Sequence, residues 1–200
     1  RETWCQNQRR MHHCINAGIG GNTTRDLLGR FERDAAVYRP HLAIVTIGGN
    51  DANPVKNVSA AEYRENLRRL AGRFADLSCE VVFQTYYAVI PPAPGEDPAL
   101  TTRFERFHEC MQMLREEAAA TGAGLIDHLA RWEPLRRKRP DLHAVLMRDA
   151  YHVNELGNKV LALHAARAFG LRLGLLNPEP WGSARICDAL LDALAGGQDA

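Results

Sequence analysis

The sequence has almost no excess of charge and no long apolar run. Its 25 lysines and arginines nearly balance 24 aspartates and glutamates, which leaves a formal net charge of +1. A chain with this balance offers no broad basic surface for nucleic acid. Its apolar runs are much shorter than the roughly 18 residues that a membrane helix needs. We therefore expect a chain that neither binds nucleic acid nor spans a membrane. The 200 residues fit one domain, 1–200, with a C-terminal tail at 171–200.

Cysteine and serine are also scarce. The five cysteines are odd in number and scattered without a C-x-x-C pair, so they match neither a disulfide framework nor a zinc site. We predict no metal and no cofactor. The chain has only three serines, which are Ser59, Ser78 and Ser183. Because it starts with Arg1 rather than methionine, the sequence leaves the cellular compartment open, and it leaves the oligomeric state open as well.

Strand and helix patterns alternate along the chain. Short apolar runs predict four strands, from about Met11 to Asn16, Leu42 to Ile47, Val81 to Val89 and Leu125 to Asp127. Capping signals predict helices that begin near Thr24, Ser59, Thr102 and Asn154, and a further short helix runs from about Ala184 to Leu194. Such alternation is typical of βαβ units, so we predict an α/β fold with a parallel sheet covered by helices on both faces. Four strands are few, since sheets usually have about five or more.

Two glycine-rich turns follow predicted strands. Gly18-Ile19-Gly20-Gly21 comes after the first strand, and the run from Leu42 ends in Gly48-Gly49-Asn50-Asp51. A dinucleotide fingerprint would need glycine or alanine at Thr23, and a P-loop would need a Gly-Lys pair, so phosphate binding is disfavoured. Each turn either only redirects the chain or presents N–H groups to a developing oxyanion at the carboxyl edge of the sheet.

The spacing of Asp149 and His152 is a second signal. A carboxylate three residues before a histidine can hydrogen-bond one ring nitrogen and leave the other free, as in the orienting acid and the base of a nucleophilic hydrolase. Alternatively, Asp149 caps the next helix and His152 is only a surface residue. Tyr86 and Tyr87, at the end of the third strand, either line a substrate pocket or pack under the proline-rich loop at 91–98.

Three stretches of the sequence resemble, in the same order, the second, third and fifth blocks of the SGNH hydrolases, also called the GDSL esterase/lipase family. These stretches run from Asn16 to Thr24, from Gly48 to Asp51 and from Asp149 to His152. The resemblance implies a flavodoxin-like three-layer α/β/α sandwich that hydrolyses a small-molecule ester without a metal. It assigns the backbone N–H of Gly21 and the side-chain amide of Asn50 to the oxyanion hole. It makes His152 the general base and Asp149 the residue that orients it.

The chain departs from this family in the first block. A strand that ends in Gly-Asp-Ser, and so carries the nucleophile, should precede Asn16, but residues 1–13 contain no serine and no apolar strand. Ser59 fits a helix cap, Ser78 precedes a strand at its wrong end, and Ser183 lies in the tail. We therefore expect an N-terminally incomplete chain, with the nucleophilic serine and a fifth strand upstream. The alternative is a non-catalytic SGNH-like binding protein that has lost its nucleophile.

Overall fold

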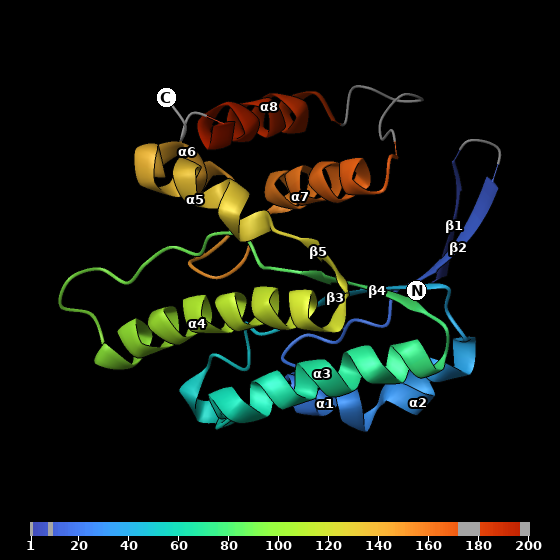
Figure 1. Cartoon of the computed structure of the whole chain (residues 1–200). Helices are drawn as coiled ribbons and strands as arrows, with labels where there is room; N and C mark the ends of the chain where they lie inside the picture. The colour runs from blue at the N-terminus through green and yellow to red at the C-terminus, as the bar shows by residue number, and fades with distance from the viewer. Residues whose placement is uncertain (1, 8–9, 172–180, 197–200) are drawn as a thin grey trace.

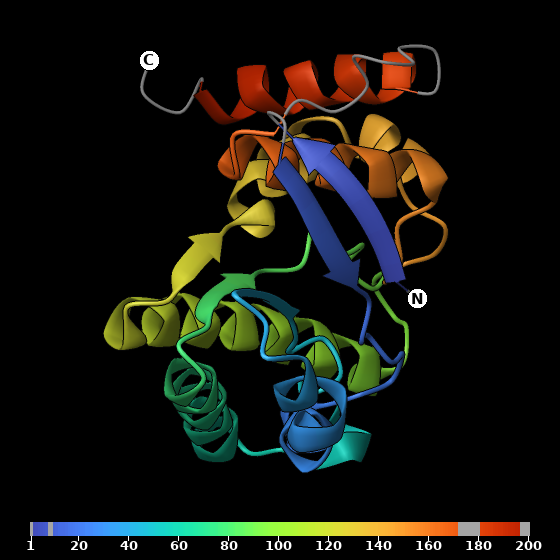
Figure 2. The ribbon, with the colours of Figure 1, turned by 90° about the vertical axis from the view of Figure 1, so that its right-hand side faces the viewer.

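Figure 1 shows a computed structural model of the chain, which describes residues 2–7, 10–171 and 181–196. At its centre is a parallel sheet in the order β3-β4-β5, formed by β3 (Leu42–Thr46), β4 (Glu80–Gln84) and β5 (Gly124–Ile126). Helices α1 to α4 lie on one side of this sheet and α5 to α7 on the other, with α8 packed outside them (Figures 1 and 2). The predicted three-layer α/β/α fold is confirmed.

The helices mostly follow the capping signals in the sequence. On the first side they are α1 (Thr24–Gly29), α2 (Phe31–Asp34), α3 (Ala60–Asp76) and α4 (Pro98–Thr121). On the second side they are α5 (His128–Lys138), α6 (Pro140–Val145), α7 (Glu155–Ala168) and α8 (Gly182–Gly196). The predicted caps are confirmed at α3, where Ser59 Oγ accepts from the Glu62 N–H at 3.2 Å, and at α7, where Asn154 Oδ1 accepts from the Gly157 N–H at 3.0 Å.

Some predicted boundaries were wrong. The third predicted strand extended to Val89, but β4 ends at Gln84 and the buried segment that follows belongs to no strand. The helix predicted near Thr102 begins one turn earlier, because Asp97 accepts from the Ala99 N–H at 2.9 Å and Pro98 suits the first helical position. Residues 85–97 therefore connect β4 to α4 without a strand or helix.

The N-terminal strand was placed in the wrong sheet. A strand is present at β2 (Arg10–Ile15), but it pairs antiparallel with β1 (Glu2–Asn7) in a separate two-stranded ribbon, which projects from the body of the molecule (Figures 1 and 2). The prediction that this strand is the fourth strand of the parallel sheet was wrong, and the strand β1 before it was not predicted. Of the β2 side chains whose burial the structure describes, those of His12, His13 and Cys14 are exposed and that of Ile15 is half-buried, so none of them needs a place in the central sheet. Neighbouring segments can pair antiparallel locally.

The C-terminal segment is an integral part of the second helical layer. The predicted short helix is confirmed as α8, which packs on α5 and α7. Arg131 of α5 donates to the backbone oxygen of Asp188 at 2.6 Å and to Asp192 Oδ1 at 2.8 Å, which ties the two helices together. The turn predicted at 177–180 lies outside the described residues. In the described part of the chain, no helix has both the length and the apolar character needed to cross a membrane.

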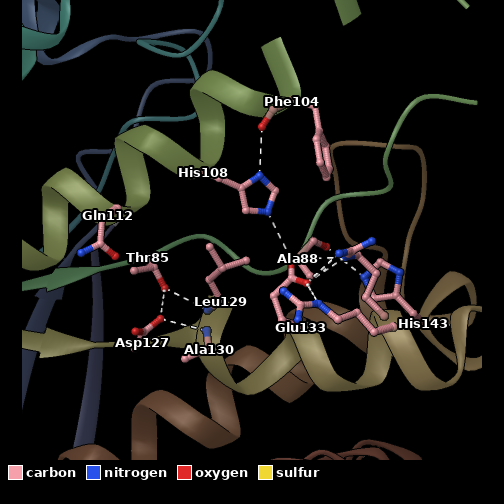
Figure 3. Close-up of polar contacts among 12 residues, drawn as sticks. Thr85, Ala88, Phe104, His108, Gln112, Asp127, Leu129, Ala130, Glu133 and His143 are labelled. Atoms are coloured by element: carbon pink, nitrogen blue, oxygen red, sulfur yellow. Dashed lines mark hydrogen bonds and ion pairs between the residues drawn. The ribbon is translucent and has the colours of Figure 1, made fainter. Parts of the chain in front are cut away.

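His108 links α4 to α5 through a hydrogen bond to Glu133. His108 Nδ1 lies 2.9 Å from the backbone oxygen of Phe104, and its Nε2 lies 3.2 Å from Glu133 Oε1 (Figure 3). Both partners are acceptors, and only the protonated ring can donate to both, so this arrangement favours the protonated form of His108. The hydrogen bond to Glu133 raises the pKa of His108. Burial alone would raise the pKa of Glu133, but hydrogen bonds from His108 and Arg136 outweigh it and lower that pKa to about 2.

This pair predicts a pH-dependent contribution to stability. Because the pKa of His108 is raised in the folded state, its contribution is complete below the unfolded value of 6.5 and is lost as the pH rises through the folded value. We expect His108→Gln to lower the free energy of unfolding by up to about 1 kcal/mol at about pH 6, and by less at about pH 9. Urea unfolding at the two pH values measures this difference. An equal loss at both would contradict the charged assignment.

Candidate active site

The site lies where β3 and β4 end, at the carboxyl edge of the parallel sheet. A cavity of about 600 Å³ opens there, and Gly21, Asn50 and His152 all line it. Asp149 lies behind the ring of His152 rather than on the cavity wall. The structure therefore brings the four predicted residues together from three separate turns. Ligands of open α/β sheets bind at this edge, so the cavity has the expected place for chemistry.

Asp149 and His152 form a closely bonded pair. His152 Nδ1 lies 2.8 Å from Asp149 Oδ1 and 3.0 Å from Oδ2, while Oδ1 also accepts from the N–H groups of Tyr151 and His152 at 2.9 Å each. These bonds, first that from the Tyr151 N–H and then that from the His152 ring, lower the pKa of Asp149 to about 2. The ionised carboxylate accepts the Nδ1 proton, so in the neutral ring Nε2 is the acceptor.

The loop that carries this pair is fixed by the segment after β4. Tyr87 Oη donates to the backbone oxygen of Tyr151 at 2.8 Å and accepts from the Val153 N–H at 3.2 Å. The Ile90 N–H donates to the Ala150 oxygen at 2.9 Å. Of the two tyrosines whose role the sequence left open, Tyr87 supports the loop, whereas Tyr86 lines the cavity. The position of His152 thus depends on buried backbone contacts and not on its own exposed side chain.

The turn after β3 places Asn50 through an unusually close packing of Gly48. Gly48 has φ of +112°, and a Cβ there would collide with Tyr63 Oη and lie 2.7 Å from Met111 Cε. Asp51, two residues after Gly49, is buried and accepts from the Thr24 N–H at 2.9 Å and from Thr24 Oγ1 at 2.6 Å. This contact holds the two glycine-rich turns against each other. Burial raises the pKa of Asp51.

The packing of Gly48 gives a stability prediction with a matched control. Gly95 also has a positive φ, +88°, but a Cβ there meets nothing within 4 Å. Alanine therefore carries a backbone penalty at both positions and a steric clash only at Gly48. We expect Gly48→Ala to lower the free energy of unfolding by about 1–3 kcal/mol more than Gly95→Ala does, as measured by urea unfolding. Equal losses would show that Tyr63 and Met111 move aside freely.

Two N–H donors face the same cavity. Asn50 Nδ2 donates one hydrogen to the backbone oxygen of Asn22 at 3.0 Å, and its amide nitrogen carries a second hydrogen that this bond does not use. Gly21 has φ of +83°, and its N–H makes no hydrogen bond to any residue that the structure describes. Both groups are therefore available to an oxygen atom in the cavity, which is the requirement for an oxyanion hole.

No described serine lies in the cavity. Ser59 caps α3, Ser78 occupies a left-handed turn with φ of +55° between α3 and β4, and Ser183 lies in α8. The free edge of β3 forms one wall instead, and Ile44 in that strand is 49% exposed. Among the described residues β3 pairs only with β4. Its other edge is unpaired and lines the same cavity as His152 and Asn50.

Some residues around the site gave no signal in the sequence. The contact between Thr24 and Asp51 joins residues that look like a helix start and a turn, and neither pattern indicates the partner. Arg103 of α4 lines the cavity and stacks on the ring of Tyr151, with Cζ 4.0 Å from the ring centroid. The sequence around Arg103 indicates only a helix, so the sequence alone does not predict that this side chain lines the cavity.

A three-layer α/β/α fold with its site at the carboxyl ends of the strands is the architecture of the SGNH esterases. The sequence profile of the GDSL-like lipase/acylhydrolase family matches residues 2–160, and the chain belongs to that family. The predicted family resemblance is thereby confirmed, and by class the chain is a serine esterase or acylhydrolase.

Several proteins that are similar to this chain are acetylxylan esterases. An acetylxylan esterase from Geobacillus stearothermophilus is 28% identical over 165 residues, which cover 78% of this chain and 71% of that enzyme. The crystal structure of a catalytic mutant of Axe2, an acetylxylan esterase from the same organism, is 25% identical, with a TM-score of 0.67 and coverage of 80% and 73%. The acetyl xylan esterase AlAXEase, 21% identical with a TM-score of 0.66 and coverage of 76% and 78%, shares the fold.

Proposed function

We propose that this chain supplies the base, its orienting acid and the oxyanion hole of a serine esterase that removes acetyl groups from carbohydrates. One observation carries the proposal. His152 is bonded through Nδ1 to Asp149 and lines the same cavity as two N–H donors, those of Gly21 and Asn50. A base, the residue that orients it and an oxyanion site are the parts that nucleophilic acyl transfer requires in addition to the nucleophile.

The proposed mechanism assigns one step to each residue. A serine oxygen attacks the ester carbonyl carbon while His152 Nε2 takes the serine proton. The oxygen of the tetrahedral intermediate accepts hydrogen bonds from the Gly21 N–H and the Asn50 amide. His152 then gives the proton to the leaving alcohol oxygen, and the acyl-serine bond remains. Water repeats the sequence, with acetate as product and serine restored, while Asp149 holds the ring in one tautomer throughout.

We place the nucleophilic serine upstream of Arg1 in the natural protein, on a strand that pairs with the open edge of β3. The support is the position of that edge. It forms a wall of the cavity, and the strand ends beside the turn that carries Asn50. A residue at the carboxyl end of a parallel neighbour of β3 would therefore lie at the mouth of the cavity, near His152. In this proposal residues 1–200 form one domain together with that strand.

Similar enzymes support both the residues and the substrate. The solved structures of Axe2 include catalytic mutants in which a serine, an aspartate and a histidine are each replaced by alanine. The aspartate and the histidine lie three positions apart in that enzyme, as Asp149 and His152 do here. The names of the related enzymes indicate acetylated xylan as their substrate, so we choose acetyl esters of carbohydrates as the substrate class.

A second candidate function is favoured by the missing serine. A carbohydrate-binding protein with this fold would keep the cavity without a nucleophile, and no described serine reaches it. Such a protein would have no need of the Asp149–His152 pair, because that bond orients a base and does not enlarge the binding surface. We therefore rank binding without catalysis second.

Hydrolysis of p-nitrophenyl acetate distinguishes the two functions. We expect no turnover above background by the 200-residue chain and turnover by a version that is extended upstream to its natural start. Circular dichroism checks that both are folded. An extended protein that is folded, binds xylo-oligosaccharides and hydrolyses no ester would support the binding function instead.

A further inference from the structure

The charged side chains on the cavity wall differ in whether hydrogen bonds and ion pairs engage their polar atoms. In addition to the proposed base His152, three charged residues line it, which are Arg30, Asp34 and Arg103. Arg30 Nη1 pairs with Asp34 Oδ2 at 2.9 Å and donates to the Ala17 oxygen at 2.7 Å, while its Nε donates to Asn22 Oδ1 at 2.7 Å. These bonds hold the first glycine-rich turn, Gly18 to Gly21, to α1 and α2, so Arg30 and Asp34 are structural.

Arg103 differs because it has no polar partner among the described residues. Its Nε is buried without a hydrogen bond, and no carboxylate in the described ranges forms an ion pair with it. Its guanidinium stacks on the ring of Tyr151, the residue before His152. Five N–H donors in a fixed plane prefer to bind oxygen, and leaving such a donor buried and unpaired is costly.

The fold directs this side chain into the cavity. Arg103 precedes Phe107 by four residues on α4, and residues at that spacing share one face of a helix. Phe107 is buried in the core and also lines the cavity, so this face of α4 looks towards the site. Arg103 and the donors Gly21 and Asn50 therefore belong to the wall of one cavity.

We propose that Arg103 is a specificity-determining residue that binds a carboxylate on the alcohol portion of the ester substrate. The inference rests on the proposed function, because an acetyl group has no ionisable group and the carboxylate must therefore lie on the alcohol. A planar guanidinium can donate two parallel hydrogen bonds to a carboxylate, which a neutral hydroxyl does not match. The preferred substrates are acetylated acidic carbohydrates.

A purely structural role for Arg103 predicts a different result. If its stacking on Tyr151 only positioned His152, any substitution would slow all esters alike. Arg103→Gln removes the positive charge and keeps much of the aliphatic part of the side chain. Arg103→Lys keeps the positive charge and loses the planar guanidinium group. Comparing the two variants on charged and neutral esters therefore separates binding of a carboxylate from support of the loop.

The test measures kcat/KM of the extended, serine-bearing protein on 4-acetoxybenzoate and on its methyl ester. The intrinsic reactivity of each ester cancels when the ratio is compared between variants. We expect Arg103→Gln to lower the charged-to-neutral ratio about ten-fold, Arg103→Lys to lower it less, and added salt to reduce the preference of the unmodified protein. Arg137→Gln, a change of an exposed arginine outside the cavity, should leave the ratio unchanged.

Two results would overturn the inference. One is an unchanged charged-to-neutral ratio, whether or not both esters react more slowly, and the other is a loss found only with p-nitrophenyl hemisuccinate, whose charge is on the acyl side. Failure of the proposed function looks different, since the unmodified protein would then hydrolyse neither acetate. In that case calorimetric titration with 4-hydroxybenzoate still tests Arg103, which should bind it more tightly than Arg103→Gln does.

Discussion

Replacing His152 by alanine is expected to lower kcat about 10⁴- to 10⁶-fold in a chain that carries the nucleophilic serine. Without an imidazole, the serine hydroxyl has no acceptor for its proton, and the leaving alcohol has no donor. The side chain of His152 is exposed and its bonds go to Asp149, so the fold does not depend on the ring. The measurement is the turnover of p-nitrophenyl acetate at saturating concentration.

The control for this variant is His41→Ala. His41 is also exposed, but it does not line the cavity, and it should keep full activity. Both variants should unfold at the urea concentration of the unmodified protein. Near-normal turnover by a well-folded His152→Ala protein would refute the assignment of the general base.

Asn50→Ala is expected to lower kcat about 10²- to 10³-fold with little change in KM. The amide donates to the oxyanion only when the tetrahedral intermediate forms, so its loss raises the barrier without weakening substrate binding. The fold should tolerate the change, because the turn is fixed by Gly48 and by the bond between Asp51 and Thr24. Steady-state kinetics on the aryl acetate separate kcat from KM.

Asn53→Ala is the matched control for Asn50→Ala. Asn53 lies in the same turn, where its side chain accepts from the Val55 N–H at 3.1 Å, and it does not line the cavity. A comparable loss of kcat in both variants would mean that the turn as a whole had moved. A rise in KM alone for Asn50→Ala would identify the amide as a binding group rather than an oxyanion donor.

Local patterns in the sequence were sufficient for the parts of the site that lie within one turn. Asp149 and His152 are three residues apart, so their bond follows from the turn itself. Asn50 follows a short buried strand directly, and the parallel sheet fixes where that strand ends. For these residues the type, the spacing and the order along the chain carried the prediction.

Contacts between segments that are far apart in the chain could not be predicted from the sequence. Thr24 and Asp51 are 27 residues apart, and each already fits a local role as a helix start or a turn residue. The strand at Arg10–Ile15 was predicted, but strand propensity does not identify a strand's partner, and it pairs with β1. Arg103 was expected in the first turn of a helix that begins near Thr102. The earlier start at Pro98 places it one turn deeper, on the face that it shares with Phe107.

Labelling of the extended protein with a fluorophosphonate, followed by peptide mapping, tests the central claim most directly. The reagent reacts with a serine that an adjacent base activates. We predict that a single serine upstream of Arg1 is labelled, that His152→Ala abolishes the labelling, and that the 200-residue chain is not labelled. Labelling of Ser59, Ser78 or Ser183, or a folded extended protein that stays unlabelled, would contradict the account.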